Sequence, residues 1–225
     1  MDDDERSAAP RTAIVVLGGV APAPGFLTDA EAGAFVVAAD SGAAHALALG
    51  LVPDVVVGDL DSIDPDLLAR LERDGARIER HRVDKDETDL ELAIDVAVRE
   101  GVEAVLVVGS HGGRVDHSAA TLMVLTAPER SGVRMSALLD GAQLSVVHGG
   151  SVLALDGAPG DVVTLLAMHG DAHGVRTTGL EYPLHGETLS AGRARGVSNV
   201  QLDAHATVSV AEGTVLVIRP GTDHP

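Results

Sequence analysis

The chain has 225 residues, and its 45% apolar content is enough for the aliphatic core of one large domain or two small ones. A formal net charge of −18 at pH 7 would repel the phosphate backbone of a nucleic acid, and Phe26, Phe35 and Tyr182 are the only aromatic residues on which bases could stack. The absence of cysteine excludes disulfides, thiolate metal sites and cysteine nucleophiles.

Residues 1–10 are expected to form a disordered acidic tail. The opening Met-Asp-Asp-Asp-Glu lacks the basic and then apolar segments of a secretory leader. No apolar run in the sequence reaches the length needed to cross a bilayer. We therefore expect a cytoplasmic protein.

Short apolar runs alternate with helical patterns between residues 11 and 142. Buried strands are predicted at residues 12–17, 35–39, 55–57, 102–108 and 133–139. Helices are predicted at residues 43–49 and 65–73, from the capping box at Thr88 to Gly101, and near residues 116–125. Strands that are apolar throughout and alternate with helices are typical of a parallel sheet covered on both faces. We expect an α/β domain of Rossmann-like type here.

The pattern changes after about residue 142, where no helix of any length is expected. Alternating runs predict strands at residues 144–147, 151–155, 162–166, 174–178, 206–210 and 214–218. His169 and His173 have a spacing that could hold a metal on a helix, but they flank Gly170-Asp171, so a hairpin turn is the better interpretation. Residues 143–225 therefore predict a C-terminal antiparallel β-sandwich domain.

Two carboxylates follow the valine run 55–57. Asp59 and Asp61 come directly after Gly58, and in an extended backbone residues i and i+2 point to the same side. Carboxylate pairs at this distance repel each other unless a cation lies between them, and Mg²⁺ is commonly held by one or two carboxylates plus substrate phosphates. A solvated Asp-rich turn is the alternative, since aspartate is common where a strand ends.

Further acidic residues follow other predicted strands or loops. Asp40 ends one strand, and the segment 84–89 reads Asp-Lys-Asp-Glu-Thr-Asp. Ligands of open parallel sheets bind outside the carboxyl ends of the strands, so these groups should converge there. Asp89 could instead only offset a helix dipole. Lys85 is the cation placed to face a phosphate, and its alternative is a solvated loop lysine.

A glycine-rich loop spans residues 109–117, Gly-Ser-His-Gly-Gly-Arg-Val-Asp-His. Glycines allow close backbone approach, and a helix N-terminus attracts phosphate, so the loop could cradle an anion. Arg114 offers a fork for phosphate oxygens or is a surface residue. His117 is a general base or, by preference, a structural or ligand-orienting residue. The loop matches no Walker A pattern, and Gly18-Gly19 lacks the dinucleotide-binding fingerprint.

Several segments together resemble the thiamin pyrophosphokinase family. In the first part they are residues 39–43 (Ala-Asp-Ser-Gly-Ala), 53–54 with 58–62 (Pro-Asp and Gly-Asp-Leu-Asp-Ser), 84–89 and 112–117. In the second part they are residues 178–184 (Thr-Gly-Leu-Glu-Tyr-Pro-Leu) and 195–199 (Arg-Gly-Val-Ser-Asn). The resemblance covers nearly the whole chain.

This resemblance implies an activity and a set of site residues. Such enzymes transfer pyrophosphate from Mg-ATP to the hydroxyl of thiamin, giving thiamin diphosphate and AMP. They are homodimers whose β-sandwich helps to hold thiamin at the subunit interface, beside an ATP- and Mg-binding α/β domain, here residues 11–142. The implied catalytic residues are Asp40, Asp59, Asp61, Asp89 and Arg114, with Asp59, Asp61 and Asp89 as metal ligands. The implied ATP-binding residues are Ser41, Gly42, Ser62, Lys85, Thr88, Ser110, Gly112, Gly113, Arg114, Asp116 and His117, and Ser198 and Asn199 would face thiamin.

Three residues depart from the family pattern. Ser41 and Ala44 stand where glycine and asparagine are frequent, and Thr121 stands where asparagine is usual. They leave two alternatives open. One is a pyrophosphokinase for another alcohol, such as a hydroxymethylpterin, and the other is a non-catalytic nucleotide-binding or sensor protein.

Overall fold

The computed structural model describes residues 11–20, 33–110 and 112–221. The expected acidic tail, His111 and residues 22–26, where two prolines predict a loop, lie outside these residues. Among the helices described, none is long and apolar enough to cross a membrane.

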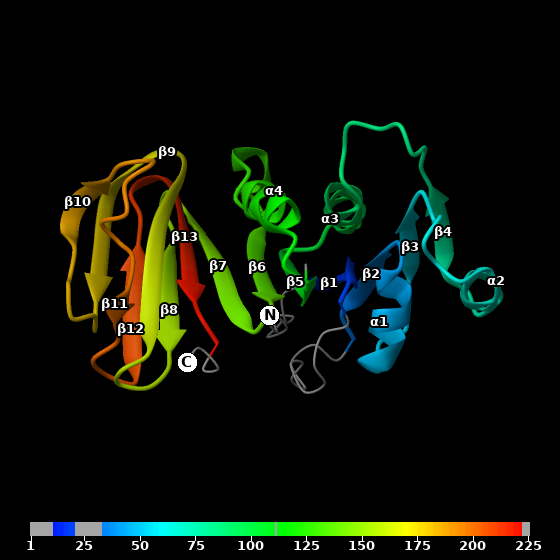
Figure 1. Cartoon of the computed structure of the whole chain (residues 1–225). Coiled ribbons are helices and arrows are strands. Elements are labelled where there is room, and N and C mark those ends of the chain that lie inside the picture. Colours follow the sequence, from blue (N-terminus) through cyan, green and yellow to red (C-terminus); the bar gives the residue numbers. More distant parts are fainter. Residues whose placement is uncertain (1–10, 21–32, 111, 222–225) are drawn as a thin grey trace, which may run out of the picture.

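The first half of the fold is a parallel sheet with the strand order β4-β3-β2-β1-β5-β6 (Figure 1). The strands are β1 (Thr12–Gly19), β2 (Phe35–Ala39), β3 (Val55–Gly58), β4 (Arg77–Arg80), β5 (Ala104–Ser110) and β6 (Arg134–Leu139). All neighbouring pairs among them are parallel, as the apolar runs predict. Together with the helices between them, these strands are called the parallel half below.

Four helices cover the two faces of this sheet. They are α1 (Gly42–Ala48), α2 (Pro65–Arg73), α3 (Asp89–Arg99) and α4 (Val115–Leu125), close to the predicted bounds. Ala43 of α1 and Leu71 of α2 pack on one face, in a cluster with the strand residues Ala38 and Val56. α3 and α4 pack on the opposite face (Figure 1). The predicted capping box of α3 is present, since Thr88 and Glu91 bond to each other's backbone N–H groups.

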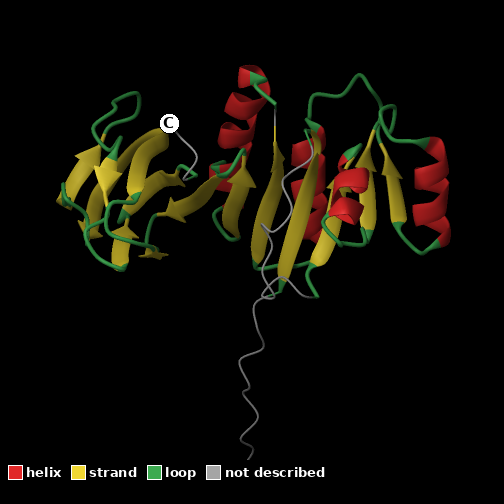
Figure 2. Ribbon diagram, turned by 60° about the horizontal axis from the view of Figure 1, so that its bottom comes forward, coloured by secondary structure: helices red, strands yellow, loops and turns green. Residues whose placement is uncertain are grey.

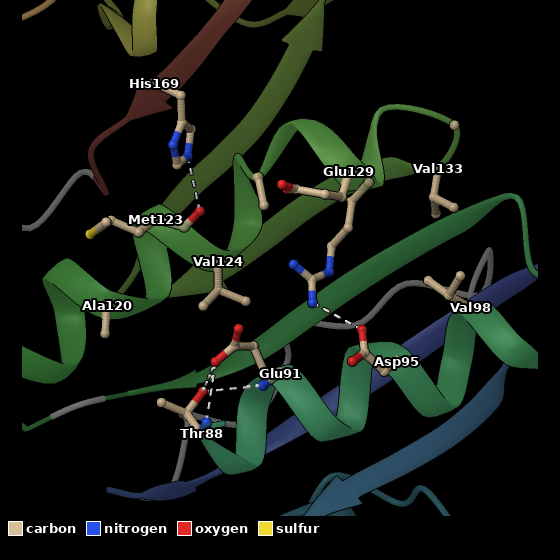
Figure 3. Close-up of a pocket in the computed structure, with 13 residues that line it drawn as sticks. Thr88, Glu91, Asp95, Val98, Ala120, Met123, Val124, Glu129, Val133 and His169 are labelled. Carbon is tan, nitrogen blue, oxygen red and sulfur yellow. Dashed lines mark hydrogen bonds and ion pairs between the residues drawn. The ribbon is translucent and has the colours of Figure 1, made fainter. Parts of the chain in front are cut away.

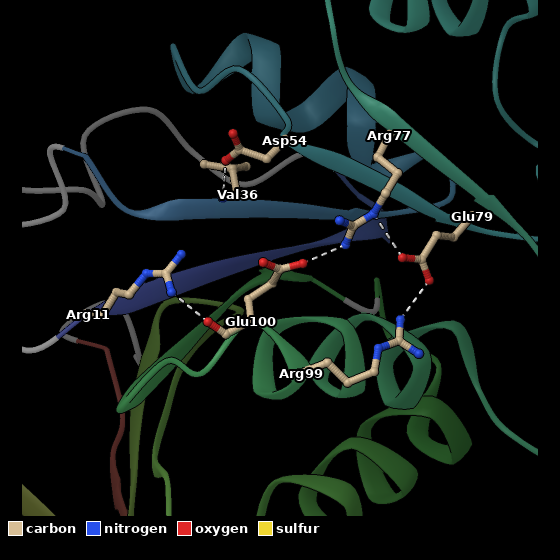
Figure 4. Close-up of polar contacts among 7 residues, drawn as sticks. All are labelled: Arg11, Val36, Asp54, Arg77, Glu79, Arg99 and Glu100. Carbon is tan, nitrogen blue, oxygen red and sulfur yellow. Dashed lines mark hydrogen bonds and ion pairs between the residues drawn. The ribbon is translucent and has the colours of Figure 1, made fainter.

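Strand β4 was not predicted, because its sequence Arg-Ile-Glu-Arg is mostly charged. Ion pairs tie this edge strand to the C-terminal end of α3 (Figure 4). Arg77 contacts Glu79 at 3.0 Å and Glu100 at 2.8 Å, and Arg99 contacts Glu79 at 2.7 Å. Charged side chains also protect an edge strand from pairing with another chain.

The second half of the fold is antiparallel and continues the same sheet. Its strands are β7 (Ala142–His148), β8 (Val152–Asp156), β9 (Val162–Thr178), β10 (His185–Leu189), β11 (Asn199–Val200), β12 (His205–Ser209) and β13 (Glu212–Arg219). The path runs from β6 through β7, β13, β9 and β12 to β8, and β10 and β11 pair with β9. Figure 2 shows that the helices lie beside the parallel strands. The turn Asp140-Gly141, with φ of 50° and 83°, joins the two halves, since such a left-handed pair suits a tight hairpin. These strands are called the antiparallel half.

The predicted hairpin at residues 169–173 is wrong. Residues 162–178 form one strand, β9, which pairs with β13 along its first part and with β10 and β12 along its second. The chain is irregular at His169 (φ 59°) and Gly170 (φ 149°), where the register with β13 shifts. Turn residues therefore mark a bulge at which the strand changes partners. Strands β10 and β11 were also not predicted.

The antiparallel half has its own apolar cluster. It includes Val147, Leu155, Leu165 and Val208, which come from four different strands. A second cluster lies between the parallel sheet and helices α3 and α4, and it extends to Leu144 of β7 and Leu216 of β13. At the coarse level the fold is thus a large mixed sheet with few helices.

Candidate active site

A cleft of about 690 Å³ runs along the carboxyl ends of β1, β2 and β3 and the N-terminal ends of α3 and α4. β1 lies between β2 and β5 in the sheet, so the chain reverses its direction of winding here, which is where open α/β sheets bind ligands. The cleft contains the predicted residues Asp40, Ser41, Asp59, Lys85, Thr88, Asp89, Arg114, Asp116 and His117. Gly18, Gly19, Ala120 and Thr121 also line it, and none of these four was predicted as a site residue.

Three carboxylates meet at the strand ends. Asp40, Asp59 and Asp61 each offer an oxygen atom, and these atoms lie within 4.8 Å of one another. The Asp61 N–H donates to Asp59 Oδ1 at 3.2 Å, and the Ser62 hydroxyl donates to Asp40 Oδ2. The neighbouring charge of Asp59 is the main reason why the pKa of Asp61 is raised.

These oxygens suit a hard divalent cation. Asp40 Oδ1 is buried, and the described part of the chain gives it no hydrogen-bond partner. A buried carboxylate oxygen without a partner is costly, and a coordinated cation would remove both this cost and the repulsion among the three side chains. The donor set, which consists of carboxylate oxygens alone, is the type that Mg²⁺ prefers.

The carboxylates converge for a different reason from the predicted one. Strand β3 ends at Gly58, and Leu60 has a φ of 63°, in the left-handed region, so the segment is not extended. A leucine in this conformation costs roughly 1 to 2 kcal/mol. Its side chain is only 6% exposed and packs in the cluster under α1 and α2. A turn, and not strand alternation, therefore directs Asp59 and Asp61 to one side.

Gly58 allows the N-terminus of α3 to approach this turn. A Cβ atom at this position would lie 3.2 Å from Asp40 Cβ and 3.2 Å from Asp89 Oδ1. Its φ of 149° is also unfavourable for other residues. The glycine thus lets two predicted site residues from different elements meet over the strand end.

Lys85 and Asp89 form an ion pair inside the cleft. Lys85 Nζ lies 2.7 Å from Asp89 Oδ1, and the lysine side chain is only 13% exposed. Lys85 is therefore not the solvated loop lysine of the alternative interpretation. Asp89 is the first residue of α3, so its charge also offsets the helix dipole. It stays outside the group of three carboxylates.

Arg114 stands at the entrance to α4 and holds Asp116. Two contacts, from Nε at 2.9 Å and Nη2 at 2.7 Å, join its fork to the Asp116 carboxylate. These hydrogen bonds lower the pKa of Asp116 strongly. The preceding Gly112 and Gly113 have φ of 55° and 83°, and Gly112 N–H donates to Ser110 Oγ at 3.2 Å. The loop therefore turns sharply beside the cleft.

Two predicted ATP-site residues lie at the N-terminus of α1. Gly42 opens this helix and is buried against β1, where a Cβ atom would collide with the Val16 carbonyl. Ser41, the residue before it, has its hydroxyl over Gly18. Close packing of the α1 N-terminus on β1 explains both glycines.

Ser198 and Asn199 lie in the antiparallel half, away from the cleft lining. The Asn199 side chain is nearly buried, accepts from Tyr182 N–H at 3.0 Å and donates to the Tyr182 carbonyl at 2.8 Å. This amide braces the 180–184 turn against β11. Ser198 has a φ of 58° and an exposed side chain, and Tyr182 is 64% exposed.

A second cavity of about 880 Å³ lies between α3 and α4 (Figure 3). It shares Thr88 and Ala120 with the cleft, so the two spaces adjoin. Arg130 and Asp95 pair at 2.9 Å on its wall, and His169 Nε2 lies 3.1 Å from Thr126 Oγ1 at its end. No sequence pattern indicated this cavity.

Two family models match the chain. One is described as "Thiamin pyrophosphokinase, catalytic domain" and matches residues 29–137. The other is described as "Thiamin pyrophosphokinase, vitamin B1 binding domain" and matches residues 152–215. The first contains the cleft carboxylates, and the second contains Ser198 and Asn199.

Curated relatives and solved structures agree with these matches. Thiamine pyrophosphokinase of Bacillus subtilis (strain 168) is 25% identical over 183 residues, which cover 81% of this chain and 86% of that protein. Thiamine pyrophosphokinase 1 of Oryza sativa subsp. japonica is 30% identical over 157 residues, covering 66% and 59%. The crystal structure of thiamine pyrophosphokinase from Bacillus subtilis has a TM-score of 0.80 at 22% identity, covering 94% of this chain and 99% of that one. The crystal structure of yeast thiamin pyrophosphokinase has a TM-score of 0.70 at 14% identity, covering 94% and 87%.

Proposed function

The chain belongs to the thiamin pyrophosphokinase family, and we propose that it transfers the terminal pyrophosphoryl group of ATP to the hydroxyl of thiamin, giving thiamin diphosphate and AMP. The observation that carries this proposal is the convergence of Asp40, Asp59 and Asp61 within 4.8 Å of one another, in the segment that the catalytic-domain model matches. Such a transfer needs little covalent chemistry from the protein. Positioning and charge neutralisation supply most of the rate.

We infer that Mg²⁺ is the cation of this cleft. Asp40, Asp59 and Asp61 would hold it, with Asp89 close by on α3. The bound cation would neutralise charge on the phosphate oxygens. Asp89 Oδ1 is paired with Lys85, so this oxygen would become available to a cation when Lys85 turns to another anion.

The phosphates of ATP supply that anion in our proposal. Lys85 would exchange Asp89 for a phosphate, and Arg114 would turn part of its fork from Asp116 to the pyrophosphoryl group. The backbone N–H groups of the turn at Gly112 and Gly113 would support the same charge. The remaining predicted ATP-site residues, Ser41, Gly42, Ser62, Thr88, Ser110 and His117, lie in or beside the cleft.

We further propose that thiamin is held by a second copy of the chain. The described lining of the cleft comes from residues 17–121 and includes no residue of the vitamin B1 binding segment 152–215. A homodimer in which one antiparallel half closes over the partner's cleft would bring the two together. Ser198 would then face thiamin with its exposed hydroxyl, whereas Asn199 would shape the pocket through the Tyr182 turn.

The domain assignment is part of this proposal. We assign residues 11–142 to a Rossmann-like ATP- and Mg-binding domain and residues 143–225 to a β-sandwich that binds thiamin. The bounds of the two family models support the division. A location in the cytoplasm stays a prediction.

The direct test is to supply the purified chain with ATP, Mg²⁺ and thiamin and to quantify AMP and thiamin diphosphate by chromatography. We expect both products in equal amounts, and far less of each with Asp59→Asn. AMP formed with a hydroxymethylpterin but not with thiamin would overturn the acceptor. ATP binding without AMP from either alcohol would favour the sensor alternative.

A further inference from the structure

Leu60 is an unusual residue for its backbone conformation. Among the described residues other than glycine, positive φ values occur at Asp40, Leu60, Asp140, His169 and Ser198. The other four are polar, and aspartate and histidine in particular are enriched in the left-handed region. A leucine persists there only when its surroundings hold it, and such outliers cluster at functional sites.

The surroundings of Leu60 hold it from two sides. Its side chain is 6% exposed and packs with Ala38, Val56 and Leu71 under α1 and α2. On the other side, β4 fixes the preceding backbone, because His81 N–H donates to the Gly58 carbonyl at 2.8 Å and Arg80 donates to the Asp59 carbonyl at 3.2 Å. The turn is thus clamped between the core and the edge strand.

The residues on either side of Leu60 are Asp59 and Asp61, two of the three carboxylates that meet at the strand ends. We propose that Leu60 is a positioning residue, whose burial holds the left-handed turn that directs Asp59 and Asp61 to one cation. The inference rests on the cation site of the proposed function. Leu60 would thus contribute to the affinity for the cation, although its side chain lies in the core and not in the cleft.

The test compares Leu60→Ala with Ile63→Ala in the full chain. Ile63 is a matched control, since it is also 6% exposed and belongs to the same cluster but lies beyond the carboxylates. The probe is Mn²⁺ alone, titrated without ATP and followed by electron paramagnetic resonance of the unbound ion. Thermal unfolding of each variant is recorded in parallel.

We expect both alanine variants to unfold at a lower temperature, but only Leu60→Ala to lose Mn²⁺ affinity, by roughly tenfold or more, as for residues that orient metal ligands. Leu60→Met, which keeps the burial, should bind Mn²⁺ like the wild type. Equal losses of affinity in Leu60→Ala and Ile63→Ala would overturn the proposal, because the core as a whole would then be responsible.

A second variant keeps the test decisive if Leu60→Ala does not fold. Leu60→Gly accepts the left-handed backbone at no cost but has no side chain to bury. We expect it to lose Mn²⁺ affinity too, and wild-type affinity in this variant would show that the turn alone suffices and overturn the proposal. A wild-type chain that binds no Mn²⁺ would overturn the cation site itself, and this inference with it.

Discussion

Asp61 in the parallel half and Asp161 in the antiparallel half have opposite surroundings. In the parallel half, Asp61 stands among Asp59, Asp40 and Asp89, and their charges raise its pKa. In the antiparallel half, the pKa of Asp161 is lowered by the Ala158 N–H and by Arg219, whose Nη2 lies 3.0 Å away. A carboxylate paired with a cation stabilises the fold, whereas carboxylates close to one another destabilise it unless a cation binds between them. The difference marks the group around Asp61 as a candidate for charge-handling chemistry.

The strongest test of this comparison is to remove one crowded carboxylate. Asp59→Asn should lower turnover by at least roughly a hundredfold, since charge stabilisation is usually the largest catalytic contribution. Asp156→Asn is the control, because Asp156 is an exposed aspartate of the antiparallel half that pairs with His205. AMP release and thermal unfolding would be measured for both. Nearly full activity in Asp59→Asn would contradict the assignment of the active site to the cleft that contains Asp59.

Mixed dimers test whether one active site is built from the residues of two chains. An Asp59→Asn chain is combined with a Ser198→Arg chain, whose long cationic side chain should block the thiamin pocket. After subunit exchange, about a quarter of wild-type activity should return, since half of randomly mixed dimers hold one intact site of two.

A matched control for this experiment is Ser190→Arg, another exposed serine of the antiparallel half. That variant should be active without any mixing. If demonstrated exchange restores no activity, the pocket lies within one chain.

Arg114→Lys tests the fork at the entrance to α4. The change keeps the charge but loses the planar pair of donors, so we expect turnover to fall roughly tenfold. Arg73→Lys on α2, where Arg73 donates to its own helix at the Ala69 carbonyl, should leave turnover unchanged. Equal activities of the two variants would make Arg114 a surface residue.

The smallest effects are expected in the pH dependence of stability without divalent cations. The pKa of Asp61 in the folded chain is raised above its ordinary value of 3.8. As the pH rises from 3.8, folded Asp61 holds its proton longer than the same residue in the unfolded chain does, so its contribution to stability falls. Asp161 has a lowered pKa, so its contribution is present above pH 3.8 and is lost as the pH falls further. In urea titrations with a chelator, Asp61→Asn should therefore gain stability at pH 7 and Asp161→Asn should lose it. A change of the same sign in both would contradict the contrast between the halves.

Much of the parallel half can be predicted from the sequence, because apolar runs such as residues 35–39 and the capping box at Thr88 act locally. The charged strand β4 escapes prediction, since Ile78 is its only apolar residue and ion pairs with the C-terminal end of α3 help to hold it at the edge. In the antiparallel half, the bulge at His169 and Gly170 has the same residues as a hairpin turn, and only the partner strands distinguish the two.

The candidate site was predictable to a similar degree. Asp40, Asp59 and Lys85 could be placed by the rule for strand ends, and the structure brings them into one cleft. The turn at Leu60 could not be foreseen, because a left-handed leucine has no sequence signal. The hydrogen bonds between the Asn199 amide and the Tyr182 backbone could not be predicted either, because the two residues lie far apart in the sequence.

The position of β13 has a consequence for the order in which the chain can fold during synthesis. This strand, residues Glu212–Arg219, lies between β7 and β9 in the sheet. When the ribosome has completed β9, every strand and helix of the parallel half has been made, but β7 and β9 still lack the strand that separates them. The nascent chain therefore has two unpaired strand edges until β13 emerges, and in this period premature pairing with a neighbouring chain is most dangerous.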